Sequence, residues 1–503
     1  MTRYIMALDQ GTSSSRAIVY TGSGEVVGHA QEDFNTSFPR DGWVEQDPET
    51  LWDTTLSSAR LALVDAGIDA ADVAGIGITN QRETTVVWDR HTGRSIYPAI
   101  VWQDRRTADR CEIMSAETVS LETGASAPVA EYIAQTTGLV IDPYFSSTKL
   151  AWILENVDGA RRRAVAGDLC FGTVDSYLIW RLTQGAVHAT DATNASRTQL
   201  FDINAQVWSN VLLDYFSIPP ALLPEVRDNV SQFGVVADNW LGASIPITGV
   251  AGDQQAALIG QACFAPGEVK STYGTGCFVI SNTGPVPVAS SQNLLTTVAY
   301  RVEGQVTYGL EGSLFTAGVA IKWLRDQLGL IESADETSRA YQATGGDSGG
   351  VFVVPAFTGL GAPHWRADAR GLITGLTLDT SKDQIITAFL QAVAFQTQEL
   401  LRAMAADGAA VGALRVDGGM VVNDEFCQFL ADILGVVVER PRDIETTARG
   451  AAILAAIGAG LYEDLASAAK MWGSERTFEP AMTEQQRRDL IAAYGRAVQQ
   501  ALA

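Results

Sequence analysis

One arrangement occurs twice in this 503-residue chain: an apolar run, a glycine-containing turn and a second apolar run. In the first half, residues 4–8 and 16–20 are the apolar runs and residues 9–15 form the turn. In the second half, residues 271–276 followed by residues 277–280 repeat the pattern. Short apolar runs bounded by Gly and Asp are typical of strands joined in hairpins. The repetition indicates a duplicated fold in which each half opens with a strand, a turn and a returning strand.

The length of the chain extends this interpretation to two lobes. A single core rarely grows beyond about 250 to 300 residues, so we expect one lobe at residues 1–249 and another at residues 250–503. Helical periodicity is clearest at residues 147–156 and 381–404, and Ser381 and Gln384 have the spacing of a capping box. Strands that alternate with helices predict an α/β fold with a cleft between the lobes.

The charge of the chain limits its partners. The formal net charge is −23, and no basic run is present. Nucleic acids and anionic membranes bind cationic faces, so we expect neither as a partner. Phosphate chemistry must then depend on a few placed side chains and a divalent cation, for which Mg²⁺ is the obvious candidate.

The apolar runs are too short for export or membrane insertion. The first run stops at Asp9, and the longest, residues 451–462, is shorter than the roughly 18 to 20 residues that a membrane span needs. The five cysteines form no CxxC pair, and the four histidines match no zinc spacing. These features predict a soluble, cytoplasmic protein with reduced thiols.

The turn at residues 9–16, Asp-Gln-Gly-Thr-Ser-Ser-Ser-Arg, is a candidate phosphate loop. Gly11 lets the backbone approach a phosphate closely, and Asp9 can hold hydrated Mg²⁺. The alternative is a serine-rich hairpin turn held by local side-chain bonds. No GxxxxGK[ST] motif exists, so a P-loop kinase is excluded. The candidate phosphate donors are Thr12, Ser13, Ser14 and Arg16.

Two further glycine turns strengthen the case for a nucleotide. Residues 273–276, Tyr-Gly-Thr-Gly, join two strands, and residues 416–419, Val-Asp-Gly-Gly, precede Asn423 at an apparent helix start. Adjacent glycines leave room for a flat adenine ring. Each turn alone is a weak signal, whereas three together favour a nucleotide clamp.

Arg82 and Glu83 follow a predicted strand at residues 75–79. Adjacent strand residues point to opposite faces, so both side chains can reach one small ligand only if the chain turns there. The alternative is a solvated pair of charges at a strand edge. Trp102 and Tyr144 are likewise candidates either for the core or for contact with a ligand.

Asp253 is the most informative acid. It follows an apolar strand and precedes a helical run, so we expect it at a helix N-terminus, where the helix dipole keeps it ionised. It is then either a plain cap or the base that accepts a hydroxyl proton during phosphoryl transfer. Gln254 beside it can hold a second hydroxyl.

On these motifs the chain resembles the FGGY carbohydrate kinases, and within that family the members that phosphorylate glycerol. The resemblance covers essentially the whole chain. The segments that carry it are residues 8–16, 77–85, 138–145, 251–256, 272–278 and 354–363. Residues 144–156 and 371–396 resemble the two general signatures of the family.

The resemblance implies a two-lobed, actin-like (ribonuclease H-like) ATPase fold that converts glycerol and ATP, with Mg²⁺, into sn-glycerol 3-phosphate and ADP. It also implies a homodimer or homotetramer. The implied glycerol contacts are Arg82, Glu83, Trp102, Tyr144, Asp253, Gln254 and Phe278, with Asp253 as catalytic base and Asp9 and Asp253 at the metal. The implied nucleotide contacts are Thr12, Ser13, Ser14, Arg16, Thr275, Gly318, Lys322, Gly419 and Asn423.

The chain departs from the family pattern in three places. Lys322 stands where Gln is usual, and residues 116–130 resemble an inserted surface loop. Residues 237–245 lack the basic residues of the family's fructose 1,6-bisphosphate loop, and no histidine lies between His188 and His364. We therefore expect neither bisphosphate inhibition nor activation by histidine phosphorylation.

Two other functions remain open from the sequence. One is an FGGY kinase for a different polyol or a ketose. The other is a non-catalytic, actin-like ATPase module that couples its nucleotide state to a partner.

Overall fold

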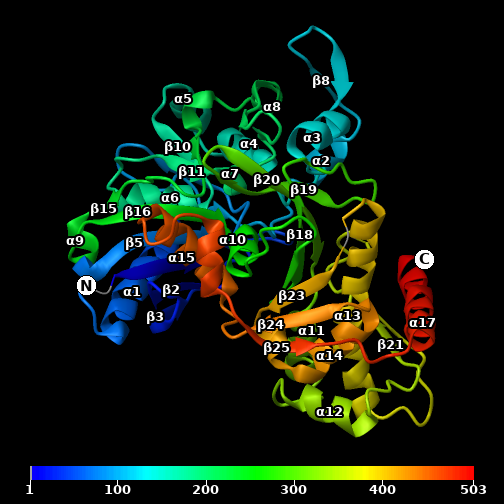
Figure 1. Ribbon diagram of the computed structural model, residues 1–503. Coiled ribbons are helices and arrows are strands. Elements are labelled where there is room, and N and C mark those ends of the chain that lie inside the picture. Colours follow the sequence, from blue (N-terminus) through cyan, green and yellow to red (C-terminus); the bar gives the residue numbers. More distant parts are fainter. Residues whose placement is uncertain (1–2, 367, 410) are drawn as a thin grey trace.

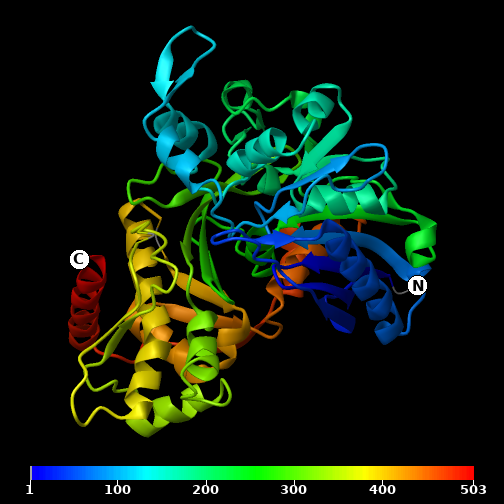
Figure 2. The ribbon, with the colours of Figure 1, turned by 180° about the vertical axis from the view of Figure 1, so that it is seen from behind.

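Two sheets, each with its own helices, divide the molecule into two lobes (Figures 1 and 2). The computed structural model describes residues 3–366, 368–409 and 411–503. The first lobe surrounds a six-stranded sheet of order β15-β16-β5-β1-β2-β3, and the second surrounds a seven-stranded sheet of order β19-β20-β18-β17-β23-β24-β25. The α/β class is confirmed.

The strands of the first sheet are β1 (Tyr4–Gln10), β2 (Ser14–Thr21), β3 (Val26–Asp33), β5 (Val73–Asn80), β15 (Val235–Val236) and β16 (Ile245–Gly252). Those of the second are β17 (Val269–Tyr273), β18 (Cys277–Gly284), β19 (Leu295–Val302), β20 (Gln305–Leu314), β23 (Ala413–Asp417), β24 (Val437–Pro441) and β25 (Ser474–Phe478). The predicted hairpin at the start of each half is confirmed as β1-β2 and β17-β18.

The two sheets share one pattern of pairing. β1 pairs antiparallel with β2 and parallel with β5, and β17 pairs antiparallel with β18 and parallel with β23. A second parallel strand and an antiparallel edge strand follow in each sheet, as β16-β15 and β24-β25. The order β3-β2-β1-β5-β16-β15 therefore matches β20-β18-β17-β23-β24-β25, which confirms the predicted duplication.

Helices cover both faces of the first sheet. Met6 and Leu8 of β1 pack toward α1 (Pro48–Ala66), while Ile5 and Ala7 pack with α15 (Thr446–Gly458). This division follows from the alternation of side chains along a strand. A helix close to the C-terminus thus completes the core of the N-terminal lobe, as its orange ribbon among blue strands shows (Figure 1).

α10 (Asp253–Gly260) lies between the lobes and contacts strands of both sheets. It packs closely on α15, because a Cβ atom at Gly260 would lie 1.9 Å from the Thr446 carbonyl oxygen and one at Gly450 would lie 1.8 Å from that of Ala256. Only glycine permits backbones to approach this closely. The packing fixes the start of α10, where Asp253 lies.

The remaining helices of the first half are α2 (Ala108–Met114), α3 (Val129–Thr137), α4 (Ser146–Asn156), α5 (Ala160–Val165), α6 (Val174–Leu182), α7 (Ala192–Ala195), α8 (Asn210–Tyr215) and α9 (Asp238–Leu241). Those of the second half are α11 (Gly318–Asp326), α12 (Glu336–Thr344), α13 (Lys382–Ala406), α14 (Asp424–Leu434), α16 (Leu465–Ala468) and α17 (Glu484–Leu502). The predicted capping box between Ser381 and Gln384 is present at the start of α13.

Among the described residues, the other strands form small two-stranded sheets: β4 (Glu45–Gln46) with β7 (Ala99–Ile100), β6 (Val86–Asp89) with β10 (Leu169–Gly172), β8 (Thr118–Ser120) with β9 (Ser126–Pro128), β11 (Ala189–Asp191) with β14 (Glu225–Arg227), β12 (Phe201–Asp202) with β13 (Val207–Trp208), and β21 (Phe352–Val354) with β22 (Leu372–Thr374). The predicted surface loop at residues 116–130 is instead largely the β8-β9 hairpin, which projects from the top of the molecule (Figure 1).

Residue 249, where we placed the lobe boundary, lies inside β16, and the exact division stays a prediction.

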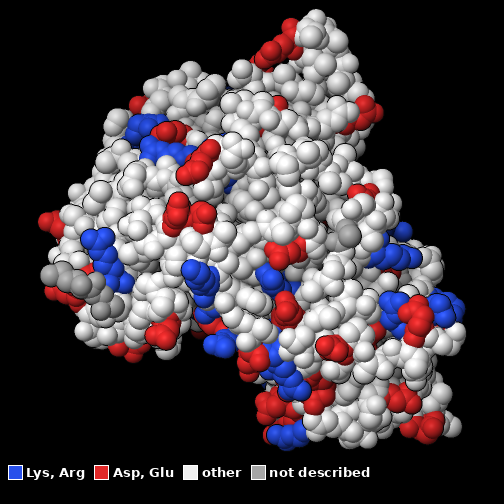
Figure 3. Space-filling view, in the orientation of Figure 1, with Lys and Arg blue, Asp and Glu red and all other residues white. Residues whose placement is uncertain are grey.

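All five cysteines are buried and free of disulfides. On the face shown in Figure 3, cationic side chains stand among acidic ones. No helix in the part of the chain that the structure describes is long and apolar enough to cross a membrane.

Candidate active site

A tight turn follows β5 and presents Arg82 and Glu83 together. β5 ends at Asn80, Glu83 has a φ of 60°, and the backbone N–H of Thr84 donates to the Arg82 carbonyl oxygen at 2.7 Å. This is the turn that the sequence required for two adjacent side chains to serve one ligand. Both residues are buried, so the alternative of a solvated charge pair is wrong.

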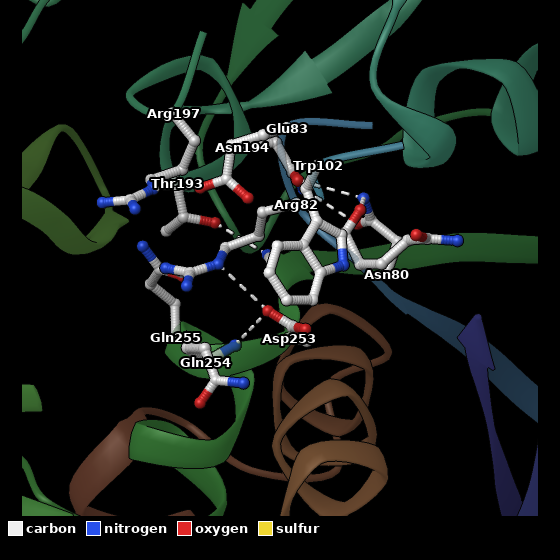
Figure 4. Close-up of polar contacts among 12 residues, drawn as sticks. Asn80, Arg82, Glu83, Trp102, Thr193, Asn194, Arg197, Asp253, Gln254 and Gln255 are labelled. Atoms are coloured by element: carbon white, nitrogen blue, oxygen red, sulfur yellow. Dashed lines mark hydrogen bonds and ion pairs between the residues drawn. The ribbon is translucent and has the colours of Figure 1, made fainter. Parts of the chain in front are cut away.

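Arg82 lies among acceptors from several elements (Figure 4). Its Nη1 and Nη2 atoms donate to the two carboxylate oxygens of Glu311, on β20, at 2.6 and 3.0 Å. Nη1 also donates to Gln255 Oε1 at 3.2 Å, and Nε lies 3.0 Å from Asp253 Oδ1. One guanidinium group therefore joins the turn after β5, the second sheet and the start of α10.

Glu83 is held at its side chain by Arg197 and at its backbone by Lys149. Arg197, which follows α7, donates from Nε to Glu83 Oε1 at 2.6 Å. Lys149 on α4 donates from Nζ to the Tyr144 carbonyl oxygen at 2.7 Å and lies 3.4 Å from the Glu83 carbonyl oxygen. Burial raises the pKa of Glu83, and Arg197 and Arg82 oppose this shift. Arg197 thus fixes the carboxylate, and Lys149 supports the backbone of Glu83 in its left-handed conformation.

Asp253 is the first residue of α10, as the sequence predicted. Gly252 precedes Asp253, and the backbone N–H of Gly252 donates to the Thr193 hydroxyl at 2.9 Å. We expected the helix dipole to keep the carboxylate ionised, but burial raises its pKa, against the lowering by Arg82, Lys270 and the Gln254 N–H. A raised pKa makes the carboxylate a better proton acceptor.

Gln254 is oriented by a buried lysine. Lys270 on β17 donates from Nζ to Gln254 Oε1 and, at 2.9 Å, to Thr272 Oγ1. Because the lysine nitrogen donates to Gln254 Oε1, the contact fixes which end of the amide faces Lys270. The Gln254 Nε2 donor is thereby left for another group.

Three aromatic side chains gather beside these polar groups. Trp102 lies edge-on to Tyr144, with ring centroids 5.6 Å apart, and to Phe278 on β18, with centroids 6.2 Å apart. The indole N–H of Trp102 donates to the Thr12 hydroxyl at 3.0 Å. Residues from three separate segments thus form one apolar wall, connected to the turn between β1 and β2.

The predicted phosphate loop is the tight turn from β1 to β2. Gly11 N–H donates to the Ser14 carbonyl oxygen at 2.9 Å, and Gln46 Nε2 donates to the Thr12 carbonyl oxygen at 2.7 Å. Arg16 already binds Gln31 and Glu445. Ser13 is exposed, and Thr12 and Ser14 are half-buried, so their hydroxyls lie at the surface of the loop.

The other predicted nucleotide residues line a single cavity of about 560 Å³ in the second lobe. They are Thr275, Gly318, Lys322, Gly419 and Asn423. Asn423 caps α14, as its position at a helix start predicted, by accepting from the Phe426 N–H at 2.8 Å. Apolar walls from Ile321, Leu390 and Met420 make the cavity suitable for a flat ring.

Asp9 fits one part of a Mg²⁺ site. Its pKa is raised to about 6, chiefly by burial and further by Asp253, while Arg16 lowers it. In the described ranges no cluster of three or more Asp, Glu, His or Cys side chains could hold a metal by itself. Asp9 and Asp253 repel each other when both are ionised, and a bound cation would reduce that repulsion. Mg²⁺ is usually held by one or two carboxylates together with phosphates and water, so this pair suits it.

Sequence reasoning missed Arg197, Lys270, Gln255 and Glu311. Glu311 is an acid within the otherwise apolar strand β20, and Lys270 is a cation within β17, and both are completely buried. Because buried charges are nearly always paired, a charged residue inside an apolar strand was the available signal.

Comparison with known proteins identifies relatives over almost the whole chain. The family models for the N-terminal and C-terminal domains of the FGGY family of carbohydrate kinases match residues 4–260 and 269–459. Glycerol kinase 1 of Pseudomonas aeruginosa is 57% identical over 99% of this chain and 99% of its own length. A glycerol kinase of Marinomonas sp. is 56% identical over 96% of this chain and 95% of its own length.

A solved structure has the same fold. The crystal structure of Plasmodium falciparum glycerol kinase with ADP superposes with a TM-score of 0.90 at 34% identity, and covers 100% of this chain and 99% of its own. A gluconate kinase from Lactobacillus acidophilus, at 20% identity, covers 100% of this chain and 98% of its own with a TM-score of 0.87, which shows the fold alone.

Proposed function

The chain belongs to the FGGY family of carbohydrate kinases, and on that premise we propose that it is a glycerol kinase, which transfers the γ-phosphoryl group of ATP to glycerol. The relatives that are more than half identical over nearly the full chain are glycerol kinases. The products are sn-glycerol 3-phosphate and ADP.

The contact between Arg82 and Asp253 is the observation that carries this proposal. Arg82 Nε lies 3.0 Å from Asp253 Oδ1, beside the turn that presents Glu83. A small polyol bound to Arg82 and Glu83 would therefore have a carboxylate within reach of one of its hydroxyls. Gln254 Nε2 and the Tyr144 hydroxyl would bind the other hydroxyls, and Trp102 and Phe278 would pack on the carbon chain.

Asp253 is proposed as the general base. It accepts the proton of the terminal hydroxyl as that oxygen attacks the γ-phosphorus, and the bond from phosphorus to the bridging oxygen of ADP breaks. Arg82 keeps the carboxylate in place through the contact at Nε. The aromatic wall limits the access of water, which would otherwise compete as the acceptor.

The nucleotide is proposed to span the two lobes. The purine and ribose would occupy the cavity lined by Gly318, Lys322, Gly419 and Asn423, with Thr275 toward the phosphates, and Thr12, Ser13, Ser14 and Arg16 would approach the phosphates from the first lobe. Mg²⁺ would be held near Asp9 and Asp253, where it neutralises charge on the phosphates. Arg16 is already bonded to Gln31 and Glu445, so it must give up at least one of these contacts before it can donate to a phosphate.

Location and regulation stay predictions. We propose a cytoplasmic enzyme that acts as a homodimer or homotetramer, with glycerol as its small-molecule partner. The loop at residues 237–245 contains only Asp238 as a charge, although Arg60 donates to the Trp240 carbonyl oxygen at 2.9 Å from outside it. One arginine is few for two phosphates, so we still expect no inhibition by fructose 1,6-bisphosphate and no histidine switch.

Measurement of ADP release tests the function. We expect release to require glycerol, and to be much slower with pentuloses, hexuloses or longer polyols. Faster turnover of another polyol or ketose would move the enzyme to a different branch of the family. ADP release that does not depend on any polyol would support the non-catalytic ATPase module.

A further inference from the structure

Three polar side chains proposed to bind glycerol each have an ionisable partner that does not take part in the proposed contacts with the substrate. Arg82 is paired with Glu311, Glu83 with Arg197, and Gln254 with Lys270. The partners Glu311, Arg197 and Lys270 are all completely buried. No part of the proposed reaction uses them, and none of the three has exposed surface in the structure.

Glu311 joins two of these pairs. Its oxygens accept two bonds from Arg82, at 2.6 and 3.0 Å, and Oε1 also accepts from Arg197 Nη2 at 3.2 Å. Arg197 in turn binds Glu83 through Nε. The four side chains form a continuous chain of opposite charges, Arg82 to Glu311 to Arg197 to Glu83, with no net charge.

The chain of charges crosses between the lobes. Arg82 and Glu83 follow β5 of the first sheet, whereas Glu311 lies in the middle of β20 of the second sheet. The two-bond contact with Arg82 fixes the plane of the guanidinium group as well as its position. Although burial alone would raise the pKa of Glu311, Arg197 and Arg82 lower it to about 2, so the carboxylate stays charged.

We infer that Glu311 is a positioning residue for glycerol: it fixes Arg82 directly and Glu83 through Arg197, and so sets the affinity for a substrate that it does not touch. The inference rests on the proposed glycerol activity. Its physical basis is that bonds to a small polyol need donors and acceptors placed within a few tenths of an ångström. An arginine that can rotate would lose those bonds.

The substitution Glu311→Gln tests the inference, because it keeps the shape and one acceptor but removes the charge. We expect the KM for glycerol to rise about 10- to 100-fold, the KM for ATP to stay within about twofold, and kcat at saturating glycerol to change less than the glycerol KM. Calorimetric titration with glycerol alone gives the same shift as a dissociation constant.

A matched control separates positioning from stability. Asp228 lies in the first lobe and binds Arg301 of β19, with Nε to Oδ1 at 2.6 Å, so it also links the lobes by an ion pair. Neither residue contacts Arg82, Glu83 or Asp253 through any described hydrogen bond or ion pair. We expect Asp228→Asn to lower stability without altering the KM for glycerol.

A double variant covers the case in which Glu311→Gln folds poorly. Glu311→Gln with Arg197→Gln restores equal numbers of buried positive and negative charges, so stability should recover relative to the single variant. Affinity for glycerol should not recover, because Arg82 and Glu83 both lack their partners. Recovery of affinity together with stability would overturn the inference.

The outcomes also distinguish this inference from the proposed function. If the unaltered enzyme releases no ADP with glycerol, the proposed function is wrong. If the unaltered enzyme uses glycerol but folded Glu311→Gln has the same glycerol KM, only the positioning role is wrong. An equal rise in the KM values for glycerol and ATP would also contradict the role, since that result indicates general disorder of the site.

Discussion

The glycerol side and the nucleotide side of the proposed site are built in different ways. On the glycerol side, Arg82 and Glu83 are buried and each is fixed by an ion pair. On the nucleotide side, a cavity of about 560 Å³ is lined by glycines, apolar side chains and uncharged polar ones, and the charged residues on its wall, Lys322, Arg325 and Asp335, are exposed. A small uncharged substrate brings little binding energy, so its partners must be held in place beforehand. A nucleotide carries several charges and a large flat ring, so a cavity of the right shape can supply much of its binding without preset ion pairs.

The largest effect expected from this comparison is on catalysis. Asp253→Asn keeps the shape of the side chain but removes the proton acceptor, so we expect kcat to fall about 10²- to 10⁴-fold. Affinity for glycerol should stay within a few-fold, because the amide can still contact Arg82. Steady-state rates and calorimetric titration with glycerol provide the two measurements. A kcat near that of the unaltered enzyme would leave Asp253 as a helix-terminal residue only.

The next effect is on substrate affinity. Arg82→Ala removes a donor from glycerol and leaves Glu311 with Arg197 as its remaining ion-pair partner. We expect the glycerol KM to rise about 10- to 100-fold, with little change in the KM for ATP. A rise in the KM for ATP without a rise in the KM for glycerol would contradict the assignment of Arg82 to the glycerol side.

Buried charge on the glycerol side should also make stability depend on pH. Burial lowers the pKa of Lys149 to about 7, although Glu83 partly opposes this shift. An unfolded lysine titrates near pH 10.4, so between pH 7 and that value the unfolded chain binds more protons and stability rises with pH. The expected gain from Lys149 is about 2 kcal/mol between pH 7 and 9.

Lys149→Met isolates this contribution. Urea unfolding at pH 7 and at pH 9 should show a smaller gain in stability for the variant than for the unaltered protein. Lys270, whose pKa burial also lowers, remains in both proteins and cancels in the difference. Equal gains in the two proteins would mean that Lys149 stays charged in the folded state up to pH 9.

The smallest effect concerns the nucleotide side. A Cβ atom at Gly419 would meet no protein atom within 4 Å, so Gly419→Val should fold normally and fill part of the cavity. We expect the KM for ATP to rise about tenfold, Gly419→Ala to have a smaller effect, and the KM for glycerol to stay unchanged. A change in the glycerol KM alone would place the nucleotide elsewhere.

Local patterns in the sequence predicted the parts of the site that neighbouring residues build. The turns after β1 and β17 follow from glycine between apolar runs, and the need for a turn at Glu83 follows from strand geometry. The cap at Asn423 and the helix start at Asp253 likewise depend on adjacent residues. Each of these features is decided within a few residues, which is the range over which sequence patterns carry information.

The partners that hold the site were not predictable in the same way. Glu311 meets Arg82 only because β20 of one sheet comes against the turn after β5 of the other. Trp102, Tyr144 and Phe278 come from three separate segments, and spacing alone does not bring them together. Such contacts are set by the packing of whole elements, so the sequence can only indicate that a buried charge needs some partner.

The position of α15 in the first lobe also affects how the protein is made. Residues 446–458 cover the face of the first sheet that carries Ile5 and Ala7, yet a ribosome synthesises them almost last. At about 5 to 20 residues per second, the N-terminal strands emerge tens of seconds before the helix that buries them. During translation that apolar face must be left exposed or covered by a chaperone, and a chain that stops short of α15 cannot complete either the first lobe or the support for α10.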